Sequence, residues 1–431
     1  MKKVFSVFAA AALLFAAASC DSGIYYPIEK PSTPVEDEDP GEEDPEPDPV
    51  IPDGEEFRKI ADVIEAMSPG WNLGNTLESN SGETDNMWLE SWSDHSTSTY
   101  ETAWGQPVAT RELIHMFAEA GFKAIRVPVT WYPHMGELNV KNGVWNMDDW
   151  VGDEVDPVWM ARVHEVVDYV IDEGLYCILN VHHDTGDYSA AWLRATMDGF
   201  NFARDRYASL WKQIAIEFRD YDEHLLFEGY NEMLDSYGSW CFASYASPSK
   251  YDEASASDSY KAINRYAQLF LDSVRETGGN NYSRNLVVCT YGGCSGDGTW
   301  NKHLQDPLKN MILPSDTAPS GHVAFEVHSY WDCSKFGDSQ KKEIDKLFSN
   351  VKQYLSDPAG GVPVIIGEWG NNNSSGSTAD QEVAFAGYFA SQARANGCPN
   401  FWWMSLSDGS DRSVPKWTRP DIKDAIIGAY E

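Results

Sequence analysis

Two glutamates stand at the ends of two apolar runs in the chain. Glu232 follows the run at 225–230 in the stretch FEGYNE, and Glu368 ends the run VPVIIGE. One such carboxyl is the ordinary start of a loop, but two of them can act as a pair. Two carboxyl groups roughly 5–5.5 Å apart can cleave a glycosidic bond with retention, because one attacks the anomeric carbon and the other protonates the leaving oxygen.

Other apolar runs end in side chains that suit the same chemistry. These residues are Asn75, Arg126, His182, His183, Asn231, His328, Tyr330, Trp402 and Trp403. A cation such as Arg126 beside one carboxylate would keep it ionised as a nucleophile, while a less polar setting would keep the other protonated. Asn75 would either contact a sugar or support Arg126, and we favour the supporting role. His183 would either line a cleft or cap its strand.

The elements that must position these residues alternate along the chain. Short apolar runs occupy 70–75, 123–129, 175–181, 225–230, 285–291, 323–330, 362–368 and 400–406. Helical patterns fill 109–121, 160–174, 207–220, 259–279, 341–355 and 381–397, and several end in glycine. The alternation predicts an α/β fold, a single (β/α)8 TIM barrel, with an open doubly wound sheet as the alternative. The helix between the fifth and sixth strands has the weakest pattern.

A closed barrel would gather the polar strand ends on one rim, where catalytic groups of this fold lie. The position of each tryptophan relative to this rim predicts whether it lies in the core or can contact a sugar. We expect Trp71, Trp131, Trp211 and Trp369 to lie mostly in the core. Trp104, Trp240 and Trp331 fall in loops after the first, fourth and sixth strands, so they are candidates for aromatic platforms under a sugar.

At the level of motifs, residues 57–431 resemble a known enzyme family. GWNLGNTLE, ETAWGQP, AGFKAIRVPVTW, ILNVHHD, FEGYNE, VHSY, IIGEWG and FWWMSL occur in this order. Together they resemble glycoside hydrolase family 5, and they look closest to its bacterial endo-β-1,4-glucanase and xyloglucanase branch. One departure is Met233, where the family usually has proline after the acid/base, so the loop that follows is expected to be unusual.

The resemblance implies a role for each matching residue. Glu232 matches the acid/base and Glu368 the nucleophile, while Asn231 matches the residue that hydrogen-bonds the sugar 2-hydroxyl. Arg126 and Tyr330 match groups that orient the nucleophile, and His182 and His328 match cleft histidines. Trp403 matches the aromatic platform before the cut, with Trp402 as the alternative if the strand register differs by one residue.

The expected function is that of a retaining endo-acting hydrolase of β-1,4-glucan backbones, either cellulose-type or mixed-linkage. Xyloglucan and β-mannan are alternative substrates, because side loops decide specificity within the family. A non-catalytic surface protein that binds glycans is the alternative from another class. The mechanism calls for no cofactor and no metal.

The N-terminal residues have the composition of a targeting segment and a tether. Lys2 and Lys3 precede an apolar run that ends at Ser19 and Cys20, which resembles a bacterial lipoprotein signal. We expect residues 1–19 to be the signal peptide, Cys20 to be acylated, and the acidic, proline-rich residues 20–56 to be a disordered tether. The protein would then sit at the outer membrane or cell surface, with secretion in soluble form as the alternative.

The net charge indicates which partners the protein can bind, and the positions of the cysteines indicate which thiols are buried. The net charge of −35 would repel nucleic acid and polyanionic polysaccharides, so a neutral polymer is the expected partner, and we expect a monomer. Cys177 and Cys289 lie inside apolar runs and should be buried thiols. The remaining cysteines of the domain leave disulfide pairing open.

Overall fold

The structure is a computed structural model that describes residues 54, 56–245, 251–316 and 320–431. The predicted signal peptide, the acylated Cys20 and nearly all of the predicted tether lie outside the described residues. Among the residues that are described, no helix combines the length and apolar character that a membrane span requires.

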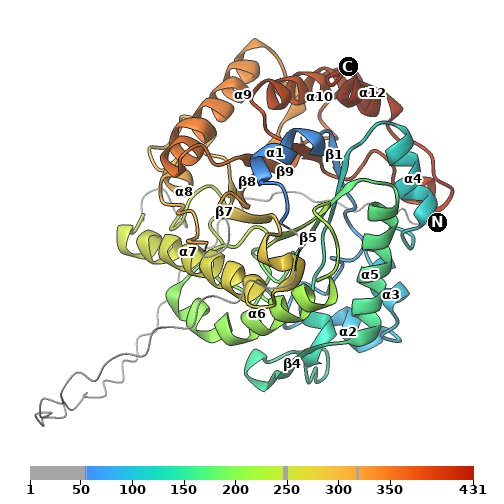
Figure 1. Ribbon diagram of the computed structural model, residues 1–431, viewed down its shortest axis with the longest axis vertical. Helices are drawn as coiled ribbons and strands as arrows, with labels where there is room; N and C mark the ends of the chain where they lie inside the picture. The colour runs from blue at the N-terminus through green and yellow to red at the C-terminus, as the bar shows by residue number, and fades with distance from the viewer. Residues whose placement is uncertain (1–53, 55, 246–250, 317–319) are drawn as a thin grey trace, which may run out of the picture. The chain divides into compact units, whose positions relative to one another are not determined.

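Eight parallel strands close into a barrel, in the order β1-β10-β9-β8-β7-β6-β5-β2 (Figure 1). They are β1 (Gly70–Asn72), β2 (Ala124–Val127), β5 (Tyr176–Asn180), β6 (Leu225–Glu228), β7 (Leu286–Cys294), β8 (Val323–Trp331), β9 (Val364–Asn371) and β10 (Asn400–Trp402). Each lies within or overlaps one of the eight predicted runs. The closure confirms the (β/α)8 prediction and excludes the open sheet.

A helix follows each barrel strand and packs outside it (Figure 1). These helices are α4 (Arg111–Glu119), α5 (Pro157–Asp172), α6 (Met197–Glu217), α7 (Glu253–Arg275), α8 (Asp306–Lys309), α9 (Asp338–Val351), α10 (Ala379–Ala395) and α12 (Pro420–Gly428). The connection between the fifth and sixth strands, which had the weakest pattern, holds only the single turn α8. Helix α6 starts earlier than predicted because Thr196 caps its first turn by accepting from the amide of Gly199.

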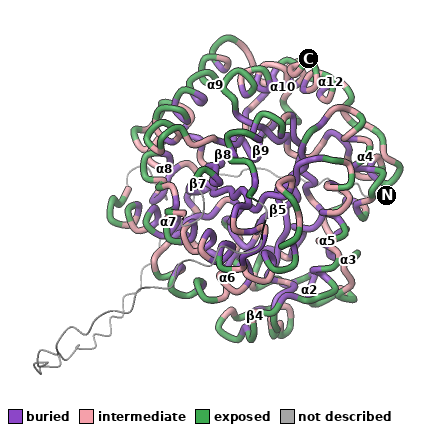
Figure 2. Tube along the Cα trace, viewed as in Figure 1, coloured by how far each residue is buried: buried purple, intermediate pink, exposed green. Residues whose placement is uncertain are grey.

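The barrel interior changes from apolar to polar along the strands. An inner cluster that includes Ala124, Ile178 and Leu226 fills the lower part, and the short helices α1 (Ile60–Val63) and η1 (Ile64–Met67) close the bottom with buried apolar side chains. Two residues further along their strands, the side chains are those of Arg126, Asn180 and Glu228. Figure 2 shows the buried strands inside a ring of helices whose outer faces are exposed.

Two features were not predicted. An antiparallel hairpin, β3 (Met135–Glu137) with β4 (Val151–Val155), is inserted between β2 and α5. The short helices α2 (Trp88–Trp92) and α3 (Thr97–Thr102) occupy the long segment between β1 and α4.

The six cysteines of the described residues all carry free thiols, and Cys177 and Cys289 are buried as expected.

Candidate active site

A layer of buried polar side chains fills the upper end of the barrel. It consists of Asn72, Arg126, Asn180, Glu228 and Glu326, and all five are completely buried. Parallel register places Asn72 beside Arg126 and Asn180 beside Glu228. Charged groups in such a place are stable only when they are paired and hydrogen-bonded. This buried layer therefore supports the residues of the rim, which lie at the ends of the strands.

Arg126 is the centre of this layer. Its Nε and Nη2 donate to the two oxygens of Glu228 at 2.6 and 2.7 Å, a two-point pairing that only a guanidinium can make. Its Nη1 donates to Glu368 at 2.7 Å, and its Nη2 also donates to the side-chain oxygen of Asn231 at 2.8 Å. One rigid cation thus positions two groups of the rim.

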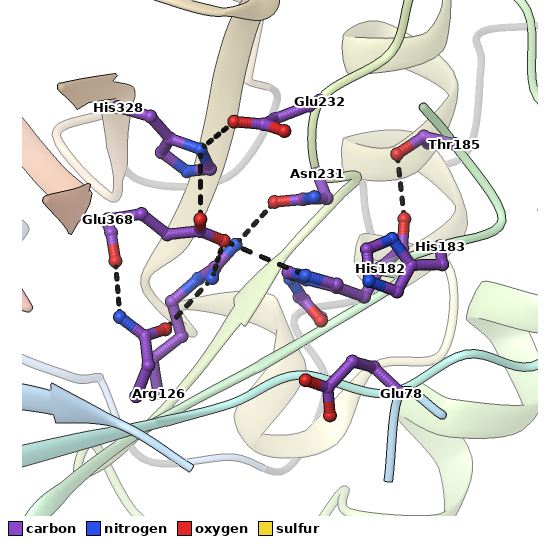
Figure 3. Close-up of polar contacts among 12 residues, drawn as sticks. Glu78, Arg126, His182, His183, Thr185, Asn231, Glu232, His328 and Glu368 are labelled. Carbon is purple, nitrogen blue, oxygen red and sulfur yellow. Dashed lines mark hydrogen bonds and ion pairs between the residues drawn. The ribbon is translucent and has the colours of Figure 1, made fainter. Parts of the chain in front are cut away.

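Glu368, in strand β9, is surrounded by donors (Figure 3). Besides the bond from Arg126, its second oxygen accepts from the hydroxyl of Tyr330 at 2.6 Å. Burial by itself would raise the pKa of this carboxyl. The charges of His328 and Arg126 and the bonds from Tyr330 and Arg126 outweigh burial and lower the pKa of Glu368 below its ordinary value. The carboxyl is held as a carboxylate.

Glu232, in the loop after β6, has the opposite setting. Its carboxyl contacts Nδ1 of His328 at 2.7 Å (Figure 3). Burial raises the pKa of Glu232, and the negative charge of Glu368 adds to the rise, while His328 opposes it. One oxygen of Glu232, one oxygen of Glu368 and a ring nitrogen of His328 all lie within 4.8 Å of one another. The two carboxyls are close in space, and their pKa values are shifted in opposite directions.

His328 lies between carboxyl groups on both sides of its ring. Nδ1 faces Glu232, and Nε2 lies 3.0 Å from an oxygen of Glu326. Burial would lower the pKa of His328, but the charges of Glu368 and Glu232 and the hydrogen bonds that the ring donates to Glu232 and Glu326 raise it to about 10. The imidazole is therefore a donor at both nitrogens when the carboxyls are ionised.

The remaining predicted polar residues also reach the rim. Nδ1 of His182 lies 3.0 Å from the side-chain nitrogen of Asn180, which leaves Nε2 to carry the proton, 3.7 Å from Glu368. Burial, and to a smaller extent the positive charges of Arg126 and His328, lower the pKa of His182 well below its ordinary value, so the ring is neutral. Because the oxygen of Asn231 accepts from Arg126, the amide nitrogen of Asn231 is left to donate to a ligand.

His183 lies in an aromatic setting. Its ring lies 5.2 Å from that of Trp104 and 5.2 Å from that of Tyr188, and burial lowers its pKa to about 4. The ring is thus neutral and packed beside aromatic side chains. The strand end is held instead by the backbone amide of His183, which donates to the hydroxyl of Thr130.

The tryptophan pair after β10 divides between the site and the core. The ring of Trp403 is parallel to that of His182, at 5.8 Å and 4°, and it is partly exposed. Trp402 is buried and packs edge-on against Trp369. The prediction of Trp402 as an alternative platform is therefore wrong, because its side chain points to the helices outside the barrel.

The other tryptophans follow the expected division with one exception. Trp71, Trp131, Trp211 and Trp369 are fully buried, as expected for core residues. Trp240 is 41% exposed, and Trp104 is partly exposed. Trp331 is only 6% exposed and donates to the hydroxyl of Ser329, so it is a buried residue and not an exposed platform.

We predicted that Asn75 supports Arg126, but the residue that does so is Asn72. The side-chain oxygen of Asn72 accepts from Arg126 at 3.0 Å, and its nitrogen donates to the carbonyl of Gly367. Asn75 has a positive φ of 59°, and its amide donates to Glu78. Asn180, Glu228 and Glu326 were also missed. The signal that marks them is a polar residue inside an apolar strand run, at an inward-facing position.

The geometry of Glu232, His328 and Glu368 would admit a metal ion. Their hydrogen bonds favour another use. Arg126 and Tyr330 already donate to Glu368, and His328 faces a carboxyl at each nitrogen. An imidazole held between two carboxyls at hydrogen-bond distance is a proton donor, whereas a metal ligand must offer a lone pair. We interpret the cluster as an acid–base network.

Comparisons with known proteins agree with this geometry. The family model described as Cellulase (glycosyl hydrolase family 5) matches residues 83–409. Endoglucanase A of Ruminococcus albus is 30% identical over 394 residues, which cover 86% of this chain and 93% of that protein. Endoglucanase A of Clostridium longisporum is 32% identical over 391 residues, which cover 87% of this chain and 66% of that protein.

Solved structures give the same result. A GH5-4 broad specificity endoglucanase from an uncultured bacterium superposes with a TM-score of 0.78 at 41% identity, covering 87% of this chain and 97% of that one. A family 5 enzyme from Prevotella bryantii B14, in complex with a xyloglucan tetradecasaccharide, gives 0.73 at 34% identity, with 87% and 99% covered. Fold and site define a barrel glycosidase. The chain belongs to glycosyl hydrolase family 5 and is a glycosidase of the cellulase type.

Proposed function

We propose that the protein is a retaining endo-β-1,4-glucanase in which Glu368 is the nucleophile and Glu232 the acid/base. In the first step Glu368 attacks the anomeric carbon while Glu232 protonates the leaving sugar oxygen, which leaves a glycosyl ester on Glu368. In the second step Glu232 removes a proton from water, and the water oxygen displaces Glu368. Two inversions restore the original anomeric configuration.

The observation that carries this proposal is the unlike setting of two close carboxyls. Arg126 and Tyr330 both donate to Glu368, and neither donates to Glu232. An oxygen of each carboxyl lies within 4.8 Å of the other, which fits the roughly 5–5.5 Å of retaining enzymes and not the 6.5–9.5 Å of inverting ones. This asymmetry assigns the ionised role to Glu368 and the protonated role to Glu232.

The same contacts account for the change of role of Glu232 between the two steps. The charge of Glu368 contributes to the raised pKa of Glu232. When Glu368 becomes an ester that charge disappears, and the pKa of Glu232 falls. Glu232 can therefore give its proton away in the first step and act as a base in the second.

The proposed substrate is a β-1,4-glucan chain with a neutral backbone. Trp403 would supply the platform under the sugar before the cut, Asn231 would donate to the 2-hydroxyl, and His182 would line the site beside Glu368. Acceptance of xyloglucan is a second candidate. The xyloglucan complex of the Prevotella bryantii relative and the broad specificity named for the GH5-4 relative favour it.

The experiment is chemical rescue of the variant Glu368→Ala. With an activated aryl β-cellobioside, turnover should be lost and partly regained with azide, and the product should be an α-glycosyl azide of inverted configuration. A β-glycosyl azide would make Glu368 the acid/base and would overturn the assignment. Glu232→Ala is the matched control, which should give the β-glycosyl azide by double displacement.

The substrate class is tested by initial rates on carboxymethylcellulose, barley β-glucan, xyloglucan, glucomannan and xylan. We expect the highest rates on the first two or on xyloglucan, and Glu368→Gln should be inactive on all five. A wild type that binds these polymers but does not exceed Glu368→Gln on any of them would favour a non-catalytic glycan-binding protein.

We also propose that residues 1–19 are a lipoprotein signal, that Cys20 is acylated and that residues 20–56 tether residues 57–431 to a membrane surface. The support is compositional: two lysines, an apolar run, a cysteine, and then an acidic segment rich in proline. An acidic tether would extend by self-repulsion and hold the enzyme away from the surface. The enzyme would act as a monomer at the outer membrane or cell surface.

A further inference from the structure

Glu326 is a buried carboxyl that the two-step mechanism does not use. It lies in strand β8, two residues before His328, and it is completely buried. One of its oxygens lies 3.0 Å from Nε2 of His328 and 3.5 Å from Nε of Arg126. The other oxygen has no hydrogen-bond partner among the described residues. Burial of a carboxyl that is only half satisfied is costly, which points to a use.

The backbone makes room for this carboxyl. Gly367 directly precedes Glu368, and a Cβ added there would overlap the carboxyl of Glu326. A Cβ on Gly293, in β7, would also lie only 3.0 Å from the ring of His328. Glycines on both neighbouring strands thus let Glu326 and His328 take their positions beside the rim.

Glu326, His328 and Glu232 form a continuous chain of hydrogen-bond partners. Two contacts of 3.0 and 2.7 Å join them through the two ring nitrogens of His328. The proton between His328 and Glu232 can sit on either group without any other atom moving. While Glu326 accepts from Nε2, both arrangements keep Nδ1 directed at Glu232. This is the logic by which a buried carboxylate orients a catalytic histidine.

Several charged or titratable groups face this pair from the neighbouring elements. They are Arg126 on β2, His182 on β5, Glu228 and Glu232 on β6 and its loop, Cys289 on β7 and Glu368 on β9. Arg126 is already paired with Glu228 and Glu368. Glu326 also lies 3.5 Å from Nε of Arg126, and its shorter contact, at 3.0 Å, is with Nε2 of His328.

We propose that Glu326 is a positioning residue that acts through His328 to hold the proton delivered by Glu232 to the leaving sugar. This inference rests on the proposed acid/base role of Glu232. Glu326 touches no substrate. It fixes the orientation of the imidazole, keeps the shared proton in place at neutral and mildly alkaline pH, and so extends the pH range in which Glu232 is an acid.

The test is Glu326→Gln, which can still accept from Nε2 and lacks the charge. The enzyme needs the proton that His328 and Glu232 share, so loss of this proton at high pH makes kcat/KM fall on the alkaline side of its pH profile. A carboxylate close to the ring raises the pKa of that proton. Removal of the charge of Glu326 should therefore shift the alkaline fall of kcat/KM to a pH that is lower by about 1–3 units. The activity near pH 5, where the proton is bound in both enzymes, should change much less than the activity near pH 8.

A pair of substrates separates this role from a merely structural one. Phenyl β-cellobioside needs acid assistance to its leaving group, and 2,4-dinitrophenyl β-cellobioside does not. At pH 8, kcat/KM of Glu326→Gln should fall at least tenfold for the phenyl substrate and much less for the dinitrophenyl substrate. Equal losses on both substrates, or an unmoved alkaline fall of kcat/KM in a folded variant, would overturn the proposal.

A measurement on the wild type needs no turnover. In protein labelled with ¹⁵N-histidine, with the signal assigned by His328→Gln, the ring of His328 should keep both nitrogen-bound protons at pH 8. A ring that loses one between pH 6 and 7 would contradict the role of Glu326. If the wild type hydrolyses none of the substrates, the proposed function fails, and this spectrum still decides the coupling of Glu326 to His328.

Discussion

Arg126 and Glu368 form an ion pair of 2.7 Å in which the guanidinium is completely buried and the carboxylate nearly so. The same guanidinium holds Glu228 through two further bonds and Asn231 through a third. The nucleophile's position therefore depends on the planar shape of one side chain as well as on its charge.

The variant Arg126→Lys should keep the charge and lose this geometry. A lysine cannot reach Glu228, Asn231 and Glu368 together, so kcat/KM should fall roughly 10²–10³-fold, the loss seen when one oriented donor is removed from an active site. Steady-state kinetics on barley β-glucan measure the fall. Arg111→Lys, at an exposed pair with Asp172, is the matched control and should keep the wild-type rate. Wild-type rates for Arg126→Lys would show that the charge alone suffices.

The pH dependence of stability should report His328. Its pKa is raised to about 10 from an ordinary 6.5, so the folded state binds this proton more tightly than the unfolded chain. The stabilisation is complete below about pH 6.5 and is lost as the pH rises through about 10. The difference in unfolding free energy between the wild type and His328→Gln should thus be largest near pH 6 and smaller at pH 9. Urea unfolding at both pH values measures it, and a difference that grows with pH would contradict the raised pKa.

Trp403 and Trp402 are neighbours in the chain, and we expect substitution to affect activity at Trp403 and stability at Trp402. Trp403→Ala should weaken glucan hydrolysis by about 1–3 kcal/mol, roughly 5–150-fold, by analogy with base stacking, and should leave the melting temperature nearly unchanged. Trp402→Ala should destabilise the fold by about 3–5 kcal/mol, because it empties a buried site. Calorimetry and kinetics on both variants separate the two roles, and a stable but inactive Trp402→Ala would reverse them.

The proposed anchor predicts a change of compartment. Cys20→Ser should move the protein from the membrane fraction to the soluble fraction of the cells that export it, because no acyl chain can be attached. The activity per molecule should stay the same, since the substitution lies outside residues 57–431. Immunoblots of the two fractions measure the shift, and unchanged partitioning would remove the lipid anchor from the proposal.

The sequence predicted the barrel because its strands are continuous apolar runs separated by amphipathic helices. It did not predict the hairpin β3–β4, whose residues are mostly exposed and form no apolar run. The rim residues were found because each closes a strand.

The buried layer beneath the rim was missed for a physical reason. Asn180 and Glu228 sit inside strands whose other residues are apolar, and hydropathy alone does not show which of them point inward. The contact of Asn72 with Arg126 was not predicted, and the supporting role was assigned to Asn75, for the same reason. Asn72 lies beside Arg126 through strand register, and register is a property of two strands that neither strand reveals by itself.

Gly367 links two positions that would otherwise vary independently over evolution. Any side chain at this position would collide with the carboxyl of Glu326, so a replacement there requires a shorter residue at 326. Conversely, a relative with a small apolar residue in place of Glu326 is released from the need for glycine before its nucleophile. The two positions should therefore covary among relatives, and enzymes that have lost the carboxyl should be recognisable from the residue that precedes the nucleophile.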